Sequence, residues 1–223
     1  MDDYPARLSA RLDPATSRWL WLVKWVLIIP HAIVLAFLWL AALVTTVIAG
    51  FSILFTGVYP RPLFDFAVGV MRWTWRVSFY ATGAFGTDKY PPFSLDPDPA
   101  YPADFTVDYP PQLSRGLVLV KWWLLALPQL FVVGFLAGGW GWERGGLITV
   151  LAVVAAAIKL FRGDYPPALF DLIMGFNRWC FRVLAYTFLL TDQYPPFRLD
   201  QGPDEPGTIR LTKPPAPVAS PVG

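Results

Sequence analysis

The side chains with the greatest capacity for chemistry form two polar stripes, each an acid followed by two arginines. The stripes consist of Asp65, Arg72, Arg76 and Asp171, Arg178, Arg182. Positions i, i+7 and i+11 share one face of an α-helix, so each stripe aligns a carboxylate with two guanidinium groups. At a membrane surface such a line can contact anionic lipid or a partner protein. Inside a membrane it can line a path for a solute or an ion.

Two interpretations of the acids remain open. Asp65 and Asp171 could approach each other as a carboxylate pair across a pseudo-twofold axis. Each could instead favour the N-terminus of its own helix, which would begin near Pro62 or Pro167. We favour the second interpretation.

Other catalytic constellations are missing from the sequence. One Cys and one His cannot build a zinc site from those ligands, and neither a nucleophile–base pair nor a glycine-rich phosphate loop is present. His31 has Gln129 as its approximate counterpart in the second half, which predicts a hydrogen-bonding role in helix packing. Cys180 is predicted to be a small apolar filler. We therefore expect no enzyme activity, no cofactor and no metal.

The composition indicates the elements that position these stripes. The chain has 223 residues, of which 55% are hydrophobic, 17% aromatic and 15% charged. Soluble proteins carry about 25% charged residues. The net charge of +2 gives no case for nucleic acid. We therefore expect an integral membrane protein whose partners are membrane lipids and other membrane proteins.

Long apolar runs predict the membrane-spanning segments. Between residues 19 and 55 the only ionisable side chains are Lys24 and His31, and we predict a helical hairpin that turns near residues 41–46. In the second half, residues 116–137 and 147–161 predict a second hairpin around a glycine-rich turn at 138–146.

The chain is an internal duplication. Residues 57–80 match residues 163–186, and the run Thr-Asp-x-Tyr-Pro-Pro-Phe-x-Leu-Asp occurs at 87–96 and again at 191–200. Leu-Val-Lys-Trp likewise occurs at 22–25 and 119–122. We expect repeat units at 4–100 and 101–200, followed by a disordered proline-rich tail at 201–223.

These repeated runs resemble a bacterial membrane-protein family catalogued as domain of unknown function 4389, in which the unit often occurs in tandem. The resemblance covers residues 4–200 and rests on the runs Gly-x-Tyr-Pro-x-x-Leu-Phe-Asp, Arg-Trp-x-x-Arg-Val and Thr-Asp-x-Tyr-Pro-Pro-Phe. It implies an architecture and no particular activity.

The helix that carries each stripe has two possible orientations. It can lie at the membrane interface with its arginines toward water and headgroups, or it can span with the stripe buried. The first orientation leaves Arg144 as the only cation on the far side, which fits cytoplasmic enrichment of Lys and Arg. We favour it, with both termini cytoplasmic in a multi-pass protein of the cell membrane.

Short alternating segments predict strand-like arms at residues 7–12 and 104–109. Their charges have opposite signs. An antiparallel pairing of the two would set Arg7 opposite Asp108 and Arg11 opposite Asp104. Each segment could instead pair with the Tyr-Pro-Pro-Phe-x-Leu segment of its own repeat, or could be a polar lead-in to a membrane helix.

The predicted fold is therefore an all-α integral membrane protein of two tandem repeats. Each repeat has a transmembrane helical hairpin, an amphipathic interfacial helix and short strand-like arms. We expect a non-enzymatic scaffold or accessory protein whose stripes contact anionic lipid or a partner protein. The alternative is a small transporter or channel with intramembrane Asp/Arg stripes.

Overall fold

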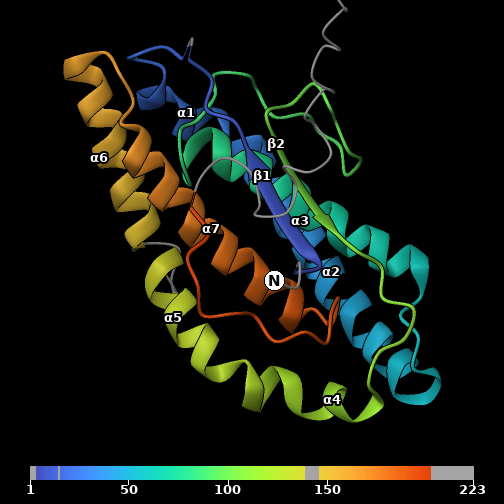
Figure 1. Ribbon diagram of the computed structural model, residues 1–223. Helices are drawn as coiled ribbons and strands as arrows, with labels where there is room; N and C mark the ends of the chain where they lie inside the picture. Colours follow the sequence, from blue (N-terminus) through green and yellow to red (C-terminus); the bar gives the residue numbers. More distant parts are fainter. Residues whose placement is uncertain (1–3, 15, 139–145, 202–223) are drawn as a thin grey trace, which may run out of the picture.

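The computed structural model describes residues 4–14, 16–138 and 146–201 (Figure 1). The first half contains β1 (Ala6–Ala10), α1 (Trp21–Leu27), α2 (Ile29–Thr56) and α3 (Arg61–Ala81). The second half contains β2 (Ala103–Val107), α4 (Arg115–Val120), the π-helical turn η1 (Lys121–Leu125), α5 (Leu127–Ala137), α6 (Leu147–Arg162) and α7 (Pro167–Thr187). Most of the predicted glycine-rich turn and of the proline-rich tail lie outside the described residues.

The described chain is mostly helical with one small two-stranded sheet, as expected. Among the described helices, α2 is the one long and apolar enough to cross a membrane. Its 28 residues extend about 42 Å, compared with a hydrocarbon core of about 30 Å.

The predicted first hairpin is wrong, because α2 runs without interruption through residues 41–46. The hydroxyls of Thr45 and Thr46 donate to the carbonyl of Ala42 within the helix, so these polar side chains do not start a turn. The helix ends only at Gly57, whose φ of 75° is left-handed and whose N–H donates to the carbonyl of Ile53.

The second hairpin prediction also fails. In Figure 1, α6 leads away from the end of α5 instead of folding back along it. The path of α5 and α6 therefore corresponds to α2 of the first repeat.

The predicted pairing of the arms is confirmed, and its register differs by two residues. β1 and β2 are antiparallel, with Leu8 opposite Phe105 and Arg7 opposite Thr106. A shift of two keeps the same side chains facing the core. Arg7 still reaches diagonally to the carboxylate of Asp108, at 2.5 and 3.1 Å.

The arms are exchanged between the repeats. β1 of the first repeat packs on α7 of the second, and β2 of the second packs on α3 of the first. The following turn is exchanged as well, because Arg18 lies against Gly163 at the end of α6 and Arg115 lies against Gly57 at the end of α2. The two repeats are therefore interlocked and do not form separate domains.

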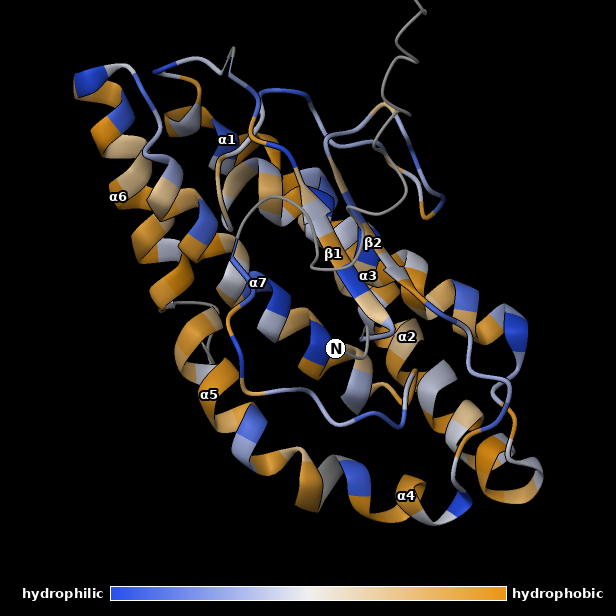
Figure 2. Ribbon diagram, viewed as in Figure 1, coloured by the Kyte–Doolittle hydropathy of each residue, from blue (hydrophilic) through white to orange (hydrophobic). Residues whose placement is uncertain are grey.

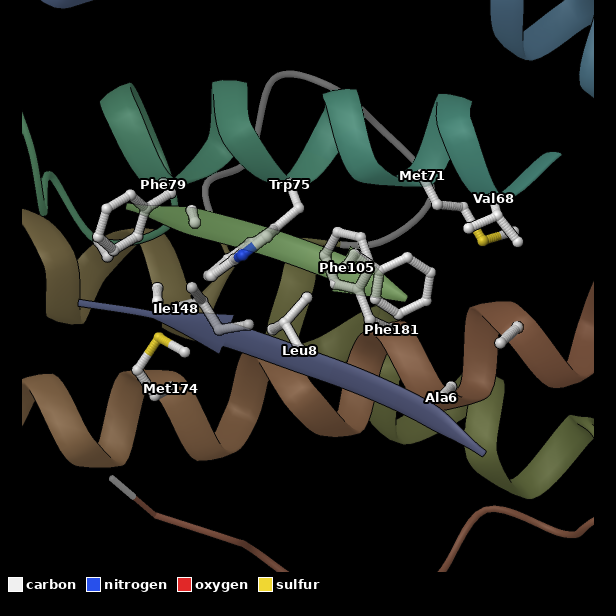
Figure 3. Packing of buried hydrophobic residues seen from close by; sticks show 14 of the residues in the cluster. Ala6, Leu8, Val68, Met71, Trp75, Phe79, Phe105, Ile148, Met174 and Phe181 are labelled. Atoms are coloured by element: carbon white, nitrogen blue, oxygen red, sulfur yellow. The ribbon is translucent and has the colours of Figure 1, made fainter. Parts of the chain in front are cut away.

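The core lies where the strands cross α3 and α7 (Figure 3). Trp75 of α3 is fully buried and donates its indole N–H to the carbonyl of Ser9, at 3.1 Å. Phe105 of β2 is fully buried, 5.3 Å from the ring of Phe181 on α7. Each strand thus contributes its apolar side chains to a core that both repeats share.

Candidate functional site

The four stripe arginines lie buried beneath the arms. In the first repeat, Arg72 donates from Nε to Asp104 at 2.9 Å and to the carbonyl of Phe105 at 3.0 Å. Its Nη1 reaches the carbonyl of Leu95, also at 2.9 Å. Arg72 is only 8% exposed. Its guanidinium therefore joins α3 to β2 and to residues 87–96, which follow α3 and are called here the C-terminal arm of the first repeat; residues 191–200 form that of the second.

Arg76, one turn further along α3, is fully buried. It donates to the carbonyls of Asp96 at 2.9 Å and Ser94 at 3.4 Å, and it lies 6.0 Å from the ring centre of Tyr101. Burial lowers the pKa of Arg76, and the carboxylate of Asp104 opposes that shift. These two carbonyls and the Asp104 carboxylate, 3.7 Å from Nη2, offset part of the cost of burying the charge.

The second repeat copies this arrangement with the exchanged arm. Arg178 donates to the carbonyl of Leu8 at 3.0 Å and to that of Asp200 at 2.5 Å. Arg182 bonds the Asp200 carboxylate at 2.6 Å and lies 5.7 Å from the ring centre of Tyr4. Each pair of arginines thus holds its own C-terminal arm and the N-terminal arm of the other repeat.

The expectation of an exposed arginine face on an interfacial helix is therefore wrong for this structure. α3 and α7 are central helices, and their arginines are covered by the strands and arms. Helical spacing identifies a shared face, and it does not say what covers that face. Direct contact of these guanidinium groups with lipid would require the arms to move away.

The two stripe acids behave differently from the arginines. Asp65 is exposed and pairs with Arg61, at 3.1 Å. Neither α3 nor α7 has an acid in its first turn, so the N-terminal interpretation of Asp65 and Asp171 is wrong as well. α3 and α7 begin at opposite ends of the molecule in Figure 1, which does not bring the two carboxylates together.

A groove of about 590 Å³, lined by both apolar and charged side chains, runs beside the first stripe. Its charged and polar lining includes Arg61, Asp65, Arg72, Asp96 and Thr106. Cations and anions alternate here at the junction of α3, β2 and the arm. The groove could hold a zwitterionic group, and it does not have the uniform sign of a simple anion site.

Glycine allows the arm to cross the first stripe closely. A Cβ on Gly69 would lie 2.8 Å from that of Leu95, which is too close. At the equivalent Gly175 the nearest atoms would be 3.6 Å away, an ordinary contact. The C-terminal arm therefore lies closer to α3 at Gly69 than its counterpart lies to α7 at Gly175.

Each repeat also contains a buried lysine with its own acidic partner, which the sequence analysis did not predict. Lys24 donates to the carbonyl of Thr87 at 2.6 Å, pairs with Asp88 at 2.9 Å and lies 4.6 Å from the ring centre of Tyr80. Its side chain is 1% exposed. Burial lowers the pKa of Lys24, and the hydrogen bond and charge of Asp88 oppose that shift.

Lys121 repeats the site in the second half. It donates to the carbonyl of Thr191 at 2.8 Å, pairs with Asp192 at 2.6 Å and lies 4.8 Å from the ring centre of Tyr186. The signal was present in the sequence, because the Leu-Val-Lys-Trp and Thr-Asp-x-Tyr runs both occur twice. These runs meet in space, and each lysine anchors the start of its C-terminal arm.

The packing role predicted for His31 is confirmed by its contacts. The indole N–H of Trp73 donates to Nδ1 of His31 at 3.0 Å, and that of Trp179 donates to Oε1 of Gln129 at 2.7 Å. An acceptor at this position is thus common to both repeats. Among the described residues no cluster of three or more His, Cys, Asp or Glu side chains could hold a metal.

Comparison with known proteins gives one match. The family model described as "Domain of unknown function (DUF4389)" matches residues 18–94 and 118–198. No curated protein and no solved structure matches the chain.

Proposed function

The chain belongs to the family described as Domain of unknown function (DUF4389), which it matches in two copies, and we propose that it is a non-enzymatic scaffold or accessory protein embedded in one leaflet of a membrane. The family description assigns no activity. The proposal rests on the contrast between the apolar face of α2 and the polar outer face of β1 and β2.

The observation that carries the proposal is the exposed apolar half of α2. Only 17% of its most apolar stretch is buried, whereas the core helix of a soluble protein is mostly buried. Large apolar side chains exposed along it are Ile29, Ile33, Val34, Phe37, Leu40, Leu43, Val44, Val47, Ile48, Phe51 and Phe55. Transferring these half-exposed side chains from water to lipid is worth on the order of 10 kcal/mol.

Other helices add to this apolar surface. Phe131 and Phe135 of α5 are 82% and 70% exposed, and Phe161 of α6 is 84% exposed. Figure 2 shows hydrophobic colours along α2, α4, α5 and α6 and more hydrophilic colours on the arms and loops. An apolar surface of this kind marks a membrane or protein interaction site.

The two-stranded ribbon formed by β1 and β2 has a polar outer face, which favours insertion of the protein into one leaflet over a helix that crosses the whole membrane. Figure 1 looks onto β1 and β2, and α2 runs across the same part of the molecule. An upright α2 would bring the polar outer face of β1 and β2, with the exposed pair Arg7–Asp108, to hydrocarbon depth, which is costly. With α2 lying flat, its apolar half enters the leaflet and the ribbon stays in water.

The alternative proposal is a small transporter or channel with upright helices. It would need the ribbon and the Asp/Arg stripes to face a water-filled space between copies. The internal bonds of Arg72, Arg76, Arg178 and Arg182 favour the scaffold. We propose the cytoplasm for the strands and both termini, because Lys and Arg are enriched on that side of membrane proteins.

Charging the exposed face of α2 should abolish membrane binding. We expect wild-type protein to float with phosphatidylcholine vesicles and to resist carbonate extraction. The triple variant Phe37→Asp, Val44→Asp, Phe51→Asp should stay in the soluble fraction, because three carboxylates would have to enter lipid.

The matched control adds the same three charges to exposed polar positions, as Thr106→Asp, Gln112→Asp, Gln193→Asp. It should float like the wild type. Far-ultraviolet circular dichroism checks that both variants keep their helices. Equal flotation of the α2 variant and the control would refute the proposal.

A further inference from the structure

An open apolar groove of about 620 Å³ lies where the two repeats meet. It runs between the C-terminal half of α2, the short helix α4 and the segment that follows α7. Its lining residues are Leu43, Thr46, Val47, Gly50, Phe51, Leu54, Val118, Leu119, Thr187 and Leu189. Leu43, Val47 and Phe51 also belong to the exposed face of α2, so the groove opens on the surface proposed to meet lipid.

The groove has a cation at one end. Gly57 follows the last turn of α2, and a Cβ placed on it would lie 3.6 Å from Nε of Arg115. Arg115 begins α4, one turn before the groove residues Val118 and Leu119. The C-terminal end of α2 carries partial negative charge, which stabilises a guanidinium at this place.

The equivalent position in the other half is filled. The repeat places Trp21 where Val118 lies, Phe85 where Leu189 lies and Ala156 where Gly50 lies. Phe85 and Leu189 share the same unusual backbone, with φ of 52° and 62°. The rings of Trp21 and Phe85 pack edge to face at 6.0 Å, and Ala156 is buried. The groove therefore results from specific smaller side chains at one of two equivalent places.

We propose that this groove binds one acyl chain of an anionic phospholipid, with the lipid phosphate at Arg115. The inference rests on the membrane placement proposed above. A groove of this volume is within the range of small-molecule sites, and its apolar lining suits a methylene chain. Arginine binds phosphate through paired N–H donors. If a second copy of the chain occupied the groove instead, the charge of Arg115 at its end would have no role in binding.

The test fills the groove with the side chains of the other half. The variant Val118→Trp, Leu189→Phe reproduces the packing of Trp21 and Phe85. Native mass spectrometry of the full chain in detergent, with phosphatidylglycerol added, should show one retained lipid on the wild type and none on this variant. Arg115→Gln should keep the lipid and lose about tenfold in preference for phosphatidylglycerol over phosphatidylcholine.

Val44→Trp is the matched control, since it adds an indole to α2 at an exposed position outside the groove. It should retain the lipid. The same lipid count on the filled variant and the wild type would overturn the inference, and so would an unchanged preference in Arg115→Gln.

Vesicle flotation separates this inference from the proposed function. The filled variant should still float, because its outer face is unchanged. Wild-type protein that floats and retains no lipid would overturn the groove inference alone. Wild-type protein that fails to float would overturn the membrane placement itself.

Discussion

Asp88→Ala is expected to lower the free energy of unfolding by about 2–4 kcal/mol. The change leaves the ammonium of Lys24 buried, with the Thr87 carbonyl, the Tyr80 ring and the more distant charge of Asp13 as its remaining favourable surroundings. Breaking a buried ion pair on one side costs about 3–5 kcal/mol. We use a lower range because the Asp88 side chain is 24% exposed. Chemical unfolding in detergent micelles, followed by tryptophan fluorescence, measures the loss.

A double variant tests whether the buried charge of Lys24 causes the loss of stability in Asp88→Ala. Removing both charges, in Lys24→Met, Asp88→Ala, should recover most of the lost stability, because the ammonium of Lys24 is then no longer buried without its partner. Asp192→Ala should behave like Asp88→Ala, since Lys121 has the same surroundings. Equal instability of Asp88→Ala and the double variant would show that the lysine charge is not the cause.

The loss in Asp88→Ala should also depend on pH. Burial lowers the pKa of Lys24 below its ordinary value of 10.5, and without Asp88 it falls further. The folded variant then binds fewer protons than the unfolded chain at alkaline pH. The difference in free energy of unfolding between the wild type and Asp88→Ala should therefore decrease as the pH rises toward 10.5.

Phe105→Ala is expected to cost about 3–5 kcal/mol, the range for emptying a fully buried phenylalanine site. Phe105 lies opposite Leu8 in the ribbon and against Phe181 of α7. A two-stranded ribbon is marginal by itself, so loss of this ring should loosen both strands together. Chemical unfolding measures the cost, and hydrogen exchange should accelerate at residues 6–10 and 103–107.

The neighbouring Thr106→Ala serves as the control, because this side chain is exposed on the outer face of the ribbon. Its effect should stay within about 0.5 kcal/mol. Faster exchange in β2 with unchanged exchange in β1 would contradict the interlocked arrangement of the arms.

Sequence reasoning predicted the parts of the fold that recur. The duplication and the shared hydrogen-bonding role of His31 and Gln129 follow from comparing one half with the other, and the same comparison offered the pairing of residues 7–12 with 104–109 as one possibility. The register of the ribbon was missed by two residues because alternation fixes the face of a strand and leaves even shifts open.

The errors have a common physical cause. An apolar run of 37 residues satisfies the length of two short spans or one long helix, and the glycines that interrupt the second half have no counterpart within α2. The stripes of α3 and α7 were read as exposed because the arms that cover them come from distant parts of the chain. No role was predicted for Lys24, because its partner Asp88 lies 64 residues away along the chain.

The most direct test of the membrane placement is a depth profile along α2. In a Cys180→Ser background, single spin labels would replace exposed side chains, and collision with oxygen and with a water-soluble nickel chelate would report depth in vesicles. The labelled positions are Ile33, Phe37, Leu40, Val44, Val47, Phe51 and Phe55. A helix lying flat in one leaflet predicts nearly the same depth at every position. A depth that rises to a maximum near Val44 and falls again toward both ends would contradict the account and favour upright helices.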